Sequence, residues 1–225
     1  MTAAGTDSLD DLRREAASCR ACPLWKNATQ TVFGEGPSDA DIVFVGEQPG
    51  DREDLAGRPF VGPAGLLLDR ALAEAGVDRA RAYVTNAVKH FKFEPRGKRR
   101  LHKRPNAGEI KVCKRWLIGE IEVISPQLIV ALGATAAQSL AGRPIPIQSN
   151  RGAVLELAGG LRVLITIHPS ALLRLRDEKD RHEAYDSFVQ DLRSIARIVG
   201  RPAAAPSRRG SEPDSGGRPI AARGR

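Results

Sequence analysis

The stretch from Asp41 to Gly50 reads DIVFVGEQPG. Its first five residues form an apolar, β-branched run, which predicts a buried strand. The strand ends in a glycine-rich loop that carries a carboxylate and an amide, and glycines let a backbone approach a ligand closely. Taken alone, such a loop is more often plain architecture than a binding site. Whether this loop is a binding site therefore depends on which other segments of the chain lie beside it.

Further strands are expected on the carboxyl side of this stretch, with helices between them. Helical spacing or capping residues predict helices after Ser8, over 62–75, after Asn106, up to Leu140 and up to Val199. Strands are expected over 82–88, 127–132, 153–157 and 162–167. This alternation predicts an α/β fold, a three-layer αβα sandwich around a central, mostly parallel sheet of four strands.

Three segments with polar side chains leave the ends of these strands. They read GEQPG after the first strand, TNAVKH after the second and IHPS after the last. Ligands of such sheets bind in the crevice at the carboxyl ends of the strands. We therefore expect the three segments to converge on one site.

The chain has 225 residues and a formal net charge of +8. The positive charge is concentrated in the segment 92–104, with seven Lys or Arg against Glu94, and in the tail 201–225. A focused basic loop suits a polyanion such as nucleic acid. We expect a domain over 1–200 and a basic, disordered tail over 201–225. The sequence shows no run of ~18–20 apolar residues and no secretory signal, so we expect a cytoplasmic protein without a membrane partner.

The chain has three cysteines, an odd count. Cys19 and Cys22 form a C-x-x-C pair, and Cys113 lies in the expected helix after the basic loop. Without a secretory signal, this pattern indicates a metal or redox role in a reducing compartment, not a disulfide framework.

The segment GEQPGDREDLAGRPFVGPAG, followed by TNAVKH and HPS in this order and spacing, resembles the uracil-DNA glycosylase superfamily, and within it the iron–sulfur branch. The resemblance extends from Cys19 to Val199. The run Lys98-Arg99-Arg100-Leu101-His102 resembles most closely the KRRIH loop of the X-type, covalent uracil-DNA-binding proteins, which also carry GEQPG.

This resemblance implies a role for each motif residue. The resemblance places Gly46 and Gln48 at the extruded uracil, Phe60 stacked on it, Asn86 at its polar edge, and His168 with Ser170 at its O2. These roles suit a reaction that flips a nucleotide out and builds negative charge on the leaving base. The implied phosphate contacts are Lys98, Arg99, Arg100, Lys103 and Arg104.

The X-type resemblance further implies that His102 attacks the sugar C1′, with Glu47 orienting or deprotonating its imidazole. The product is a covalent protein–DNA adduct, formed once per protein. Two alternatives remain open on the sequence: a conventional uracil-DNA glycosylase that turns over, and a non-catalytic, metal-stabilised DNA-binding module. The resemblance favours a monomer that acts on uracil-containing single-stranded DNA.

The resemblance also supplies a metal ligand set. Cys19, Cys22 and Cys113 match three cluster cysteines, and His90 aligns with the fourth. Histidine replaces cysteine on iron in other centres, so these four suit a [4Fe–4S] cluster. They are equally a good set for zinc, and the residues alone do not decide between the two.

Overall fold

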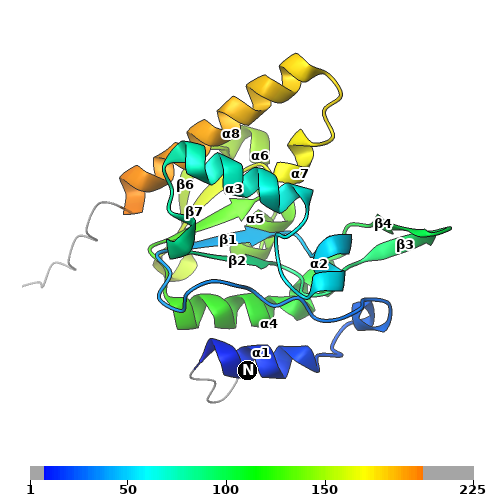
Figure 1. Ribbon diagram of the computed structural model, residues 1–225. Helices are drawn as coiled ribbons and strands as arrows, with labels where there is room; N and C mark the ends of the chain where they lie inside the picture. The colour runs from blue at the N-terminus through cyan, green and yellow to red at the C-terminus, as the bar shows by residue number, and fades with distance from the viewer. Residues whose placement is uncertain (1–7, 200–225) are drawn as a thin grey trace, which may run out of the picture.

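The fold is built on one central sheet, seen in a computed structural model that describes residues 8–199 (Figure 1). Its strand order is β2 (Ala82–Asn86), β1 (Ile42–Gly46), β5 (Leu128–Leu132), β7 (Leu161–Thr166) and β6 (Val154–Leu157). The first four strands are parallel, and β6 pairs antiparallel with β7. The predicted αβα sandwich is confirmed. The predicted count of four strands is wrong, because β6 turns back at Gly159 and Gly160 and extends the sheet by an edge strand.

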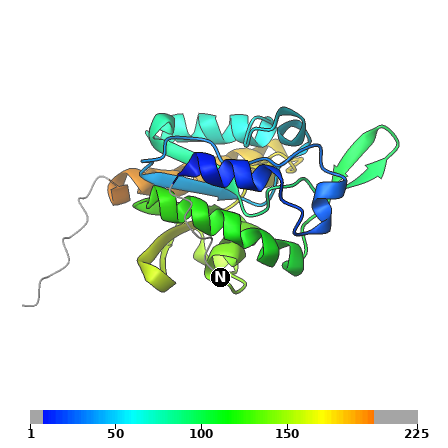
Figure 2. The ribbon, with the colours of Figure 1, turned by 90° about the horizontal axis from the view of Figure 1, so that it is seen from below.

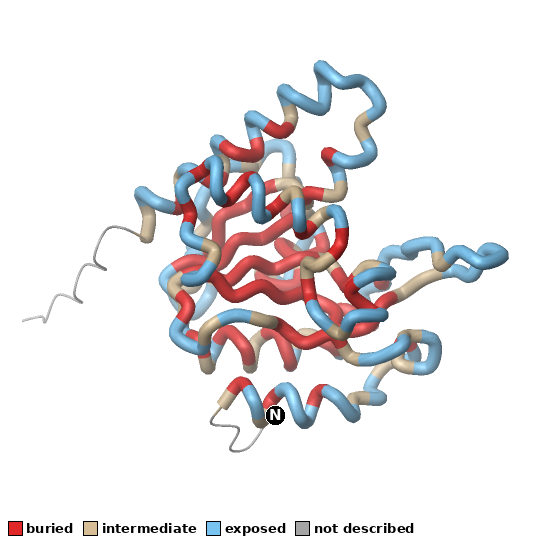
Figure 3. Tube along the Cα trace, in the orientation of Figure 1, coloured by how far each residue is buried: buried red, intermediate tan, exposed pale blue. Residues whose placement is uncertain are grey.

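Helices cover both faces of the sheet. One face packs against α1 (Leu9–Ala17), α4 (Ala107–Ile124) and α5 (Ala134–Ala141), and the other against α3 (Pro63–Ala75), α7 (Pro169–Leu172) and α8 (Glu178–Val199). Figure 2 shows α1 and α4 side by side, and Figure 3 shows buried strands between helices with exposed outer faces. The strands are buried on both faces, as continuous apolar runs predict.

Helix ends follow the capping residues of the sequence. The Ser8 hydroxyl accepts a hydrogen bond from the Asp11 amide, at 3.2 Å. At α4, the amide of Glu109 donates to the Asn106 side chain at 2.9 Å, and the Glu109 carboxylate accepts from the Asn106 amide at 2.7 Å. The predicted starts of both helices are confirmed. The remaining short elements are η1 (Pro23–Lys26), α2 (Asp51–Ala56), η2 (Arg79–Arg81), α6 (Ile147–Asn150) and η3 (Ala158–Gly160).

The basic segment 92–104 is a β-hairpin, where the sequence predicts a loop. Strands β3 (Phe93–Arg96) and β4 (Arg99–His102) pair antiparallel, with Phe93 opposite His102. The hairpin projects from the end of the molecule at which the parallel strands finish (Figures 1 and 2). The sequence hides this hairpin, because charged residues occupy both of its faces instead of one.

The expected tail 201–225 lies outside the described residues. Over residues 8–199, no helix is both long enough and apolar enough to cross a membrane.

Candidate functional site

The three predicted segments converge at the carboxyl edge of the sheet. Gly46 ends β1, Asn86 ends β2 beside it, and His168 follows β7. Two cavities open there, of about 250 and 300 Å³. They share five lining residues: Gln48, His102, His168, Ser170 and Arg174. The predicted convergence is therefore present in the structure.

The smaller cavity combines an aromatic ring with polar side chains in its lining. Phe60, Asn86 and Glu53 contribute to its wall. A Cβ on Gly46 would lie 2.3 Å from Asn86 Oδ1 and 2.9 Å from Phe60 Cζ, so only glycine allows both side chains to approach the end of β1. Phe60 is held at a φ of 56°, a strained value for a phenylalanine and typical of binding loops.

Glu53 ties together the two loops that form this cavity. Its buried carboxylate accepts a hydrogen bond from the Gly50 amide at 3.1 Å and another from the Gly62 amide at 2.7 Å. The first bond closes the GEQPG loop, and the second fixes the segment that carries Phe60. Glu53 is not among the site residues that the sequence predicts. Its place in the first turn of α2, a position where an acid caps free amides, is the signal that indicates it.

His168 faces the cavity as a neutral hydrogen-bond donor. Its Nδ1 accepts from the Ser170 amide at 3.1 Å and lies 2.8 Å from Ser170 Oγ, so the ring proton resides on Nε2. Burial lowers the pKa of His168 to about 4, and the charge of Arg174, joined by that of His102 when its ring is protonated, acts in the same direction. The Phe60 and His168 rings lie 6.2 Å apart between centroids. The uncharged His168 ring can therefore donate a hydrogen bond from Nε2 to an oxygen.

His102 lies at the boundary of the two cavities, at the end of β4. Its Nε2 is 3.5 Å from Glu47 Oε1, longer than an ordinary hydrogen bond, so the nitrogen is close to a carboxylate but not bound to it. Burial lowers the pKa of His102, and Glu47 opposes this shift while Arg174 adds to it. The imidazole is thus held neutral near pH 7, with a lone pair available for reaction.

Glu47 is itself held from two sides. Its carboxylate accepts a hydrogen bond from the Thr135 hydroxyl, at the start of α5. The guanidinium of Arg104 lies 3.6 Å from the same carboxylate and 3.1 Å from Thr135 Oγ1. Thr135 and Arg174 were also missed in the sequence, because a threonine after a strand and an arginine four residues beyond Ser170 carry no motif.

The Gln48 side chain binds the base of the hairpin. Its Nε2 donates to the carbonyls of Lys92 and Lys103, at 3.1 and 3.2 Å, and its Oε1 accepts from the Lys92 amide at 3.2 Å. Gln48 lines both cavities, but its amide is engaged by backbone groups and not directed at a ligand. We call this arrangement of Gln48, Lys92 and Lys103 the hairpin clamp.

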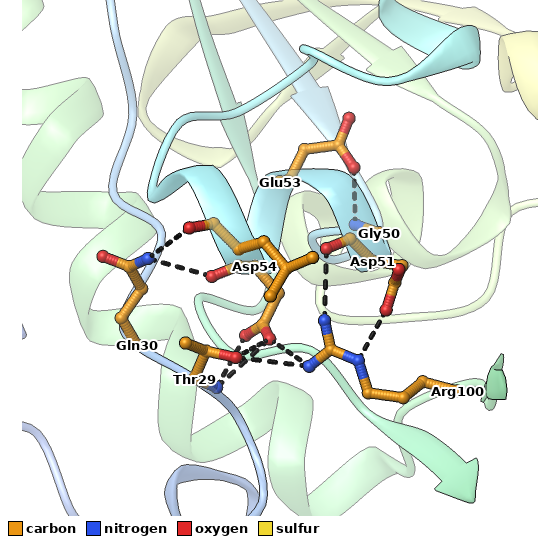
Figure 4. Close-up of polar contacts among 8 residues, drawn as sticks. Thr29, Gln30, Gly50, Asp51, Glu53, Asp54 and Arg100 are labelled. Carbon is orange, nitrogen blue, oxygen red and sulfur yellow. Dashed lines mark hydrogen bonds and ion pairs between the residues drawn. The ribbon is translucent and has the colours of Figure 1, made fainter. Parts of the chain in front are cut away.

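Arg100 fastens the hairpin to α2 (Figure 4). Its guanidinium donates to Asp51 at 2.5 Å, to the fully buried Asp54 at 2.6 Å and to Thr29 at 3.2 Å. Gln30 binds the carbonyl end of the same helix. Arg100 was predicted to contact phosphate, but its donors are occupied within the protein.

The other basic residues predicted to contact phosphate differ in whether they already form ion pairs within the protein. Lys103 pairs with Glu94 at 2.5 Å, and both side chains are largely exposed. Arg104 lies against Glu47, as described above. Lys98 and Arg99, at the exposed tip of the hairpin, form no ion pair with any described residue.

The predicted metal ligands lie between α1, η1 and α4. The three cysteines belong to one packed cluster, in which Trp116 Nε1 donates to Cys19 Sγ at 3.3 Å and the Lys89 amide to Cys113 Sγ at 3.2 Å. Burial raises the pKa of Cys113 to about 11 and also raises the pKa of Cys22. Thiols buried in this way need a cation to become thiolates.

His90 has a tautomer that suits a ligand. The Thr31 hydroxyl donates to the Ala16 carbonyl at 3.0 Å, so at its 2.9 Å contact with His90 Nε2 it accepts the ring proton. Burial lowers the pKa of His90, and the neutral ring keeps a lone pair on Nδ1. Within residues 8–199, no three His, Cys, Asp or Glu side chains converge closely enough for a single metal ion. The donor set is chemically suitable for iron, whose cluster spreads its ligands over several atoms.

A buried ion pair between Lys89 and Glu120 contacts the backbone of Asn86. Lys89 Nζ donates to the Asn86 carbonyl at 2.9 Å and to Glu120 at 2.5 Å, and both charged side chains are almost completely buried. Glu120 also accepts from Thr85 and Tyr83. Such a fully bonded network holds the end of β2 in one arrangement.

These features define an α/β protein with two small polar cavities at the ends of its parallel strands, beside a basic hairpin. The chain belongs to the uracil-DNA glycosylase superfamily: the family model described as "Uracil DNA glycosylase superfamily" matches residues 33–193. It is 45% identical to a type-4 uracil-DNA glycosylase of Thermotoga maritima over 72% of this chain and 82% of that protein. It is 37% identical to a type-4 uracil-DNA glycosylase of Archaeoglobus fulgidus over 87% of this chain and 95% of that protein.

Proposed function

We propose that this protein excises uracil from DNA and captures the resulting sugar covalently through His102. The relatives named type-4 uracil-DNA glycosylases support the first part. The observation that carries the second part is the position of His102, a neutral imidazole at the boundary of both cavities and 3.5 Å from Glu47. The run KRRLH, which resembles the X-type loop, supports the same assignment.

The smaller cavity is the proposed uracil site. Its Phe60 ring offers a face for stacking. The Asn86 side chain makes no hydrogen bond to the described part of the chain, so its amide can donate to O4 and accept from N3–H of uracil. Because only a flipped nucleotide reaches such a cavity, the base must first leave its stack.

His168 is the proposed stabiliser of the leaving base. Cleavage of the bond between C1′ and N1 leaves the bonding electron pair on uracil, as an anion delocalised onto O2. The Nε2 proton of a neutral His168 then donates to O2, and Ser170 fixes the ring for this bond. A donor of this kind contributes about 2.7–4 kcal/mol to such a barrier.

His102 is the proposed nucleophile. Its neutral nitrogen forms a bond to C1′ as the bond to uracil breaks, and the ring becomes a cationic imidazolium linked to the sugar. Glu47 stabilises that cation and accepts its remaining ring proton, which passes on to solvent, while the released uracil anion takes one proton from solvent. One proton is lost and one is gained, so the step balances with no further reactant.

Cys19, Cys22, Cys113 and His90 are the proposed ligands of a [4Fe–4S] cluster. When bound, the cluster would supply a structural cross-link between the N-terminal segment and the helix after the hairpin. Zinc remains the alternative for this donor set.

A conventional turnover glycosylase is the second candidate, and the names of the type-4 relatives favour it. In that case His102 only contacts DNA and water attacks C1′. The two candidates differ in their product. One gives a protein–DNA adduct, and the other gives free abasic DNA in excess over protein.

Incubation with a uracil-containing, single-stranded oligonucleotide separates these functions. A denaturing gel, run without alkali, is expected to show a heat- and detergent-stable shifted band that a thymine control lacks. Unshifted DNA that breaks in alkali would identify the turnover enzyme. Intact DNA would leave only a binding module.

A further inference from the structure

A third cavity, of about 380 Å³, lies on the other side of the hairpin clamp. Its apolar wall is formed by Pro23 and Leu24 of η1 together with Phe91 and Phe93, whose rings stack at 5.1 Å between centroids. Asn27 also lines it, and its side-chain amide makes no hydrogen bond to the described part of the chain.

This cavity adjoins the candidate site across the hairpin clamp. Lys92 and Lys103 line it, and their carbonyls are the groups that accept from Gln48. Gln48 in turn lines both catalytic cavities. The Gln48 side chain thus links the wall of the proposed uracil site to the wall of the third cavity.

The lining suits a base attached to an anionic backbone. Phe93 is partly exposed and presents a ring to the cavity, and such rings stack on any base. Two cations, Lys92 and Lys103, and one carboxylate, Glu94, line the cavity, and the Lys92 ammonium is already paired with Glu109 at 2.7 Å. The pair between Lys103 and Glu94 is largely exposed, so a phosphate can replace the carboxylate at little cost.

We propose that the third cavity binds a second nucleobase, one that flanks the flipped uracil in single-stranded DNA. The inference rests on the proposed function and adds a site to it. In a duplex the flanking base is paired and stacked, and extracting it costs free energy in addition to the cost of flipping uracil. The cavity therefore gives single strands an advantage over duplexes.

Binding is measured with oligonucleotides that carry 2′-fluoro-deoxyuridine, in which the glycosidic bond resists cleavage. An abasic spacer replaces each flanking base in turn, from three positions before the uracil to three positions after it. For the unmodified protein, a spacer at one or two positions is expected to weaken binding about 5- to 150-fold, the range for loss of one stacked base.

Two variants assign that loss to the cavity. Phe93→Ala removes the stacking ring, and Asn27→Trp obstructs the cavity from an exposed position outside the hairpin. Each is expected to weaken binding of the intact oligonucleotide by a similar factor and to abolish the spacer effect. Leu66→Ala, at an exposed position on α3, is the matched control and is expected to behave as the unmodified protein.

An equal spacer effect in the unmodified protein and in Asn27→Trp would overturn the proposal, as would the absence of any spacer effect. A spacer effect of the same size in duplex DNA would overturn the advantage for single strands. Failure of the proposed function is distinguishable from failure of this proposal. In that case, uracil and thymine oligonucleotides would bind equally, with or without a spacer.

Discussion

The base cavity and the hairpin differ in how the fold holds them. The base cavity grows out of the parallel sheet, with Gly46 and Asn86 ending neighbouring buried strands and His168 following a third. His102 instead lies on a projecting, largely exposed pair of strands that is fastened to the domain mainly through Gln48 and Arg100. In the proposed function, excision of the base therefore depends on the core, and capture of the sugar depends on the hairpin. The two functions are expected to be separable by mutation.

The largest effect is expected from His102→Ser. The adduct is expected to fall below detection, because a serine hydroxyl is shorter than the imidazole and a much weaker nucleophile at its ordinary pKa. Uracil release is expected to continue, slowly, as water enters the space of the ring. Release is measured from labelled uracil, and capture from the shifted band on a denaturing gel. An adduct that survives in this variant would remove His102 from the mechanism.

A substitution in the core, His168→Ala, is expected to slow uracil release about 100- to 1,000-fold by removing the donor at O2. Adduct formation is expected to slow by the same factor, since capture follows bond cleavage. Single-turnover rates measure both. Ser170→Ala is the matched control: the Ser170 amide still fixes the ring, so only a small loss is expected. An unchanged rate in His168→Ala would contradict the assignment.

A smaller and more selective effect is expected from Gln48→Leu, which breaks the hairpin clamp. Three hydrogen bonds are lost, each contributing about 0.5–1.5 kcal/mol. The fraction of excised uracils that leave a protein–DNA adduct is expected to fall about 10-fold. The amount of free abasic DNA, which breaks in alkali, is expected to rise correspondingly. Lys98→Gln, at the tip of the same hairpin, is expected to leave this fraction unchanged. If both variants behave alike, the clamp does not position His102.

The smallest effect concerns pH. Because burial and Arg174 lower the pKa of His102, the neutral and reactive form persists below pH 6.5. The rate of capture is expected to fall as the pH is lowered, with the midpoint of the fall below pH 6.5. Arg174→Gln is expected to move the midpoint of that fall to higher pH, whereas Arg174→Lys keeps the charge and the midpoint. A midpoint above pH 6.5 in the unmodified protein would contradict a neutral His102.

Much of the parallel sheet, its helices and the base cavity at the strand ends could be predicted from the sequence. Local signals suffice for a strand such as 41–45 or a capped helix such as that after Asn106, because the residues that decide them are neighbours in the chain. Gly46, Asn86 and His168 could be placed together for a related reason, since the ends of parallel strands meet at one edge.

The hairpin was predicted less well, because its contacts join distant segments. Arg100 was assigned to phosphate, yet it meets Asp54, 46 residues earlier in the chain. Gln48 was assigned to uracil, yet its amide meets backbone groups 44 and 55 residues further on. The residues next to Arg100 and Gln48 in the sequence do not indicate that these side chains bind distant parts of the protein and not a ligand.

The central claim, capture through His102, is tested most directly by stoichiometry. Excess uracil-containing, single-stranded DNA is mixed with a known amount of protein, and released uracil and adduct are counted together over time. The account predicts that both stop at one per protein molecule, with the sugar attached to the peptide that contains His102. Continued release of uracil beyond one per protein, with no modified peptide, would contradict it.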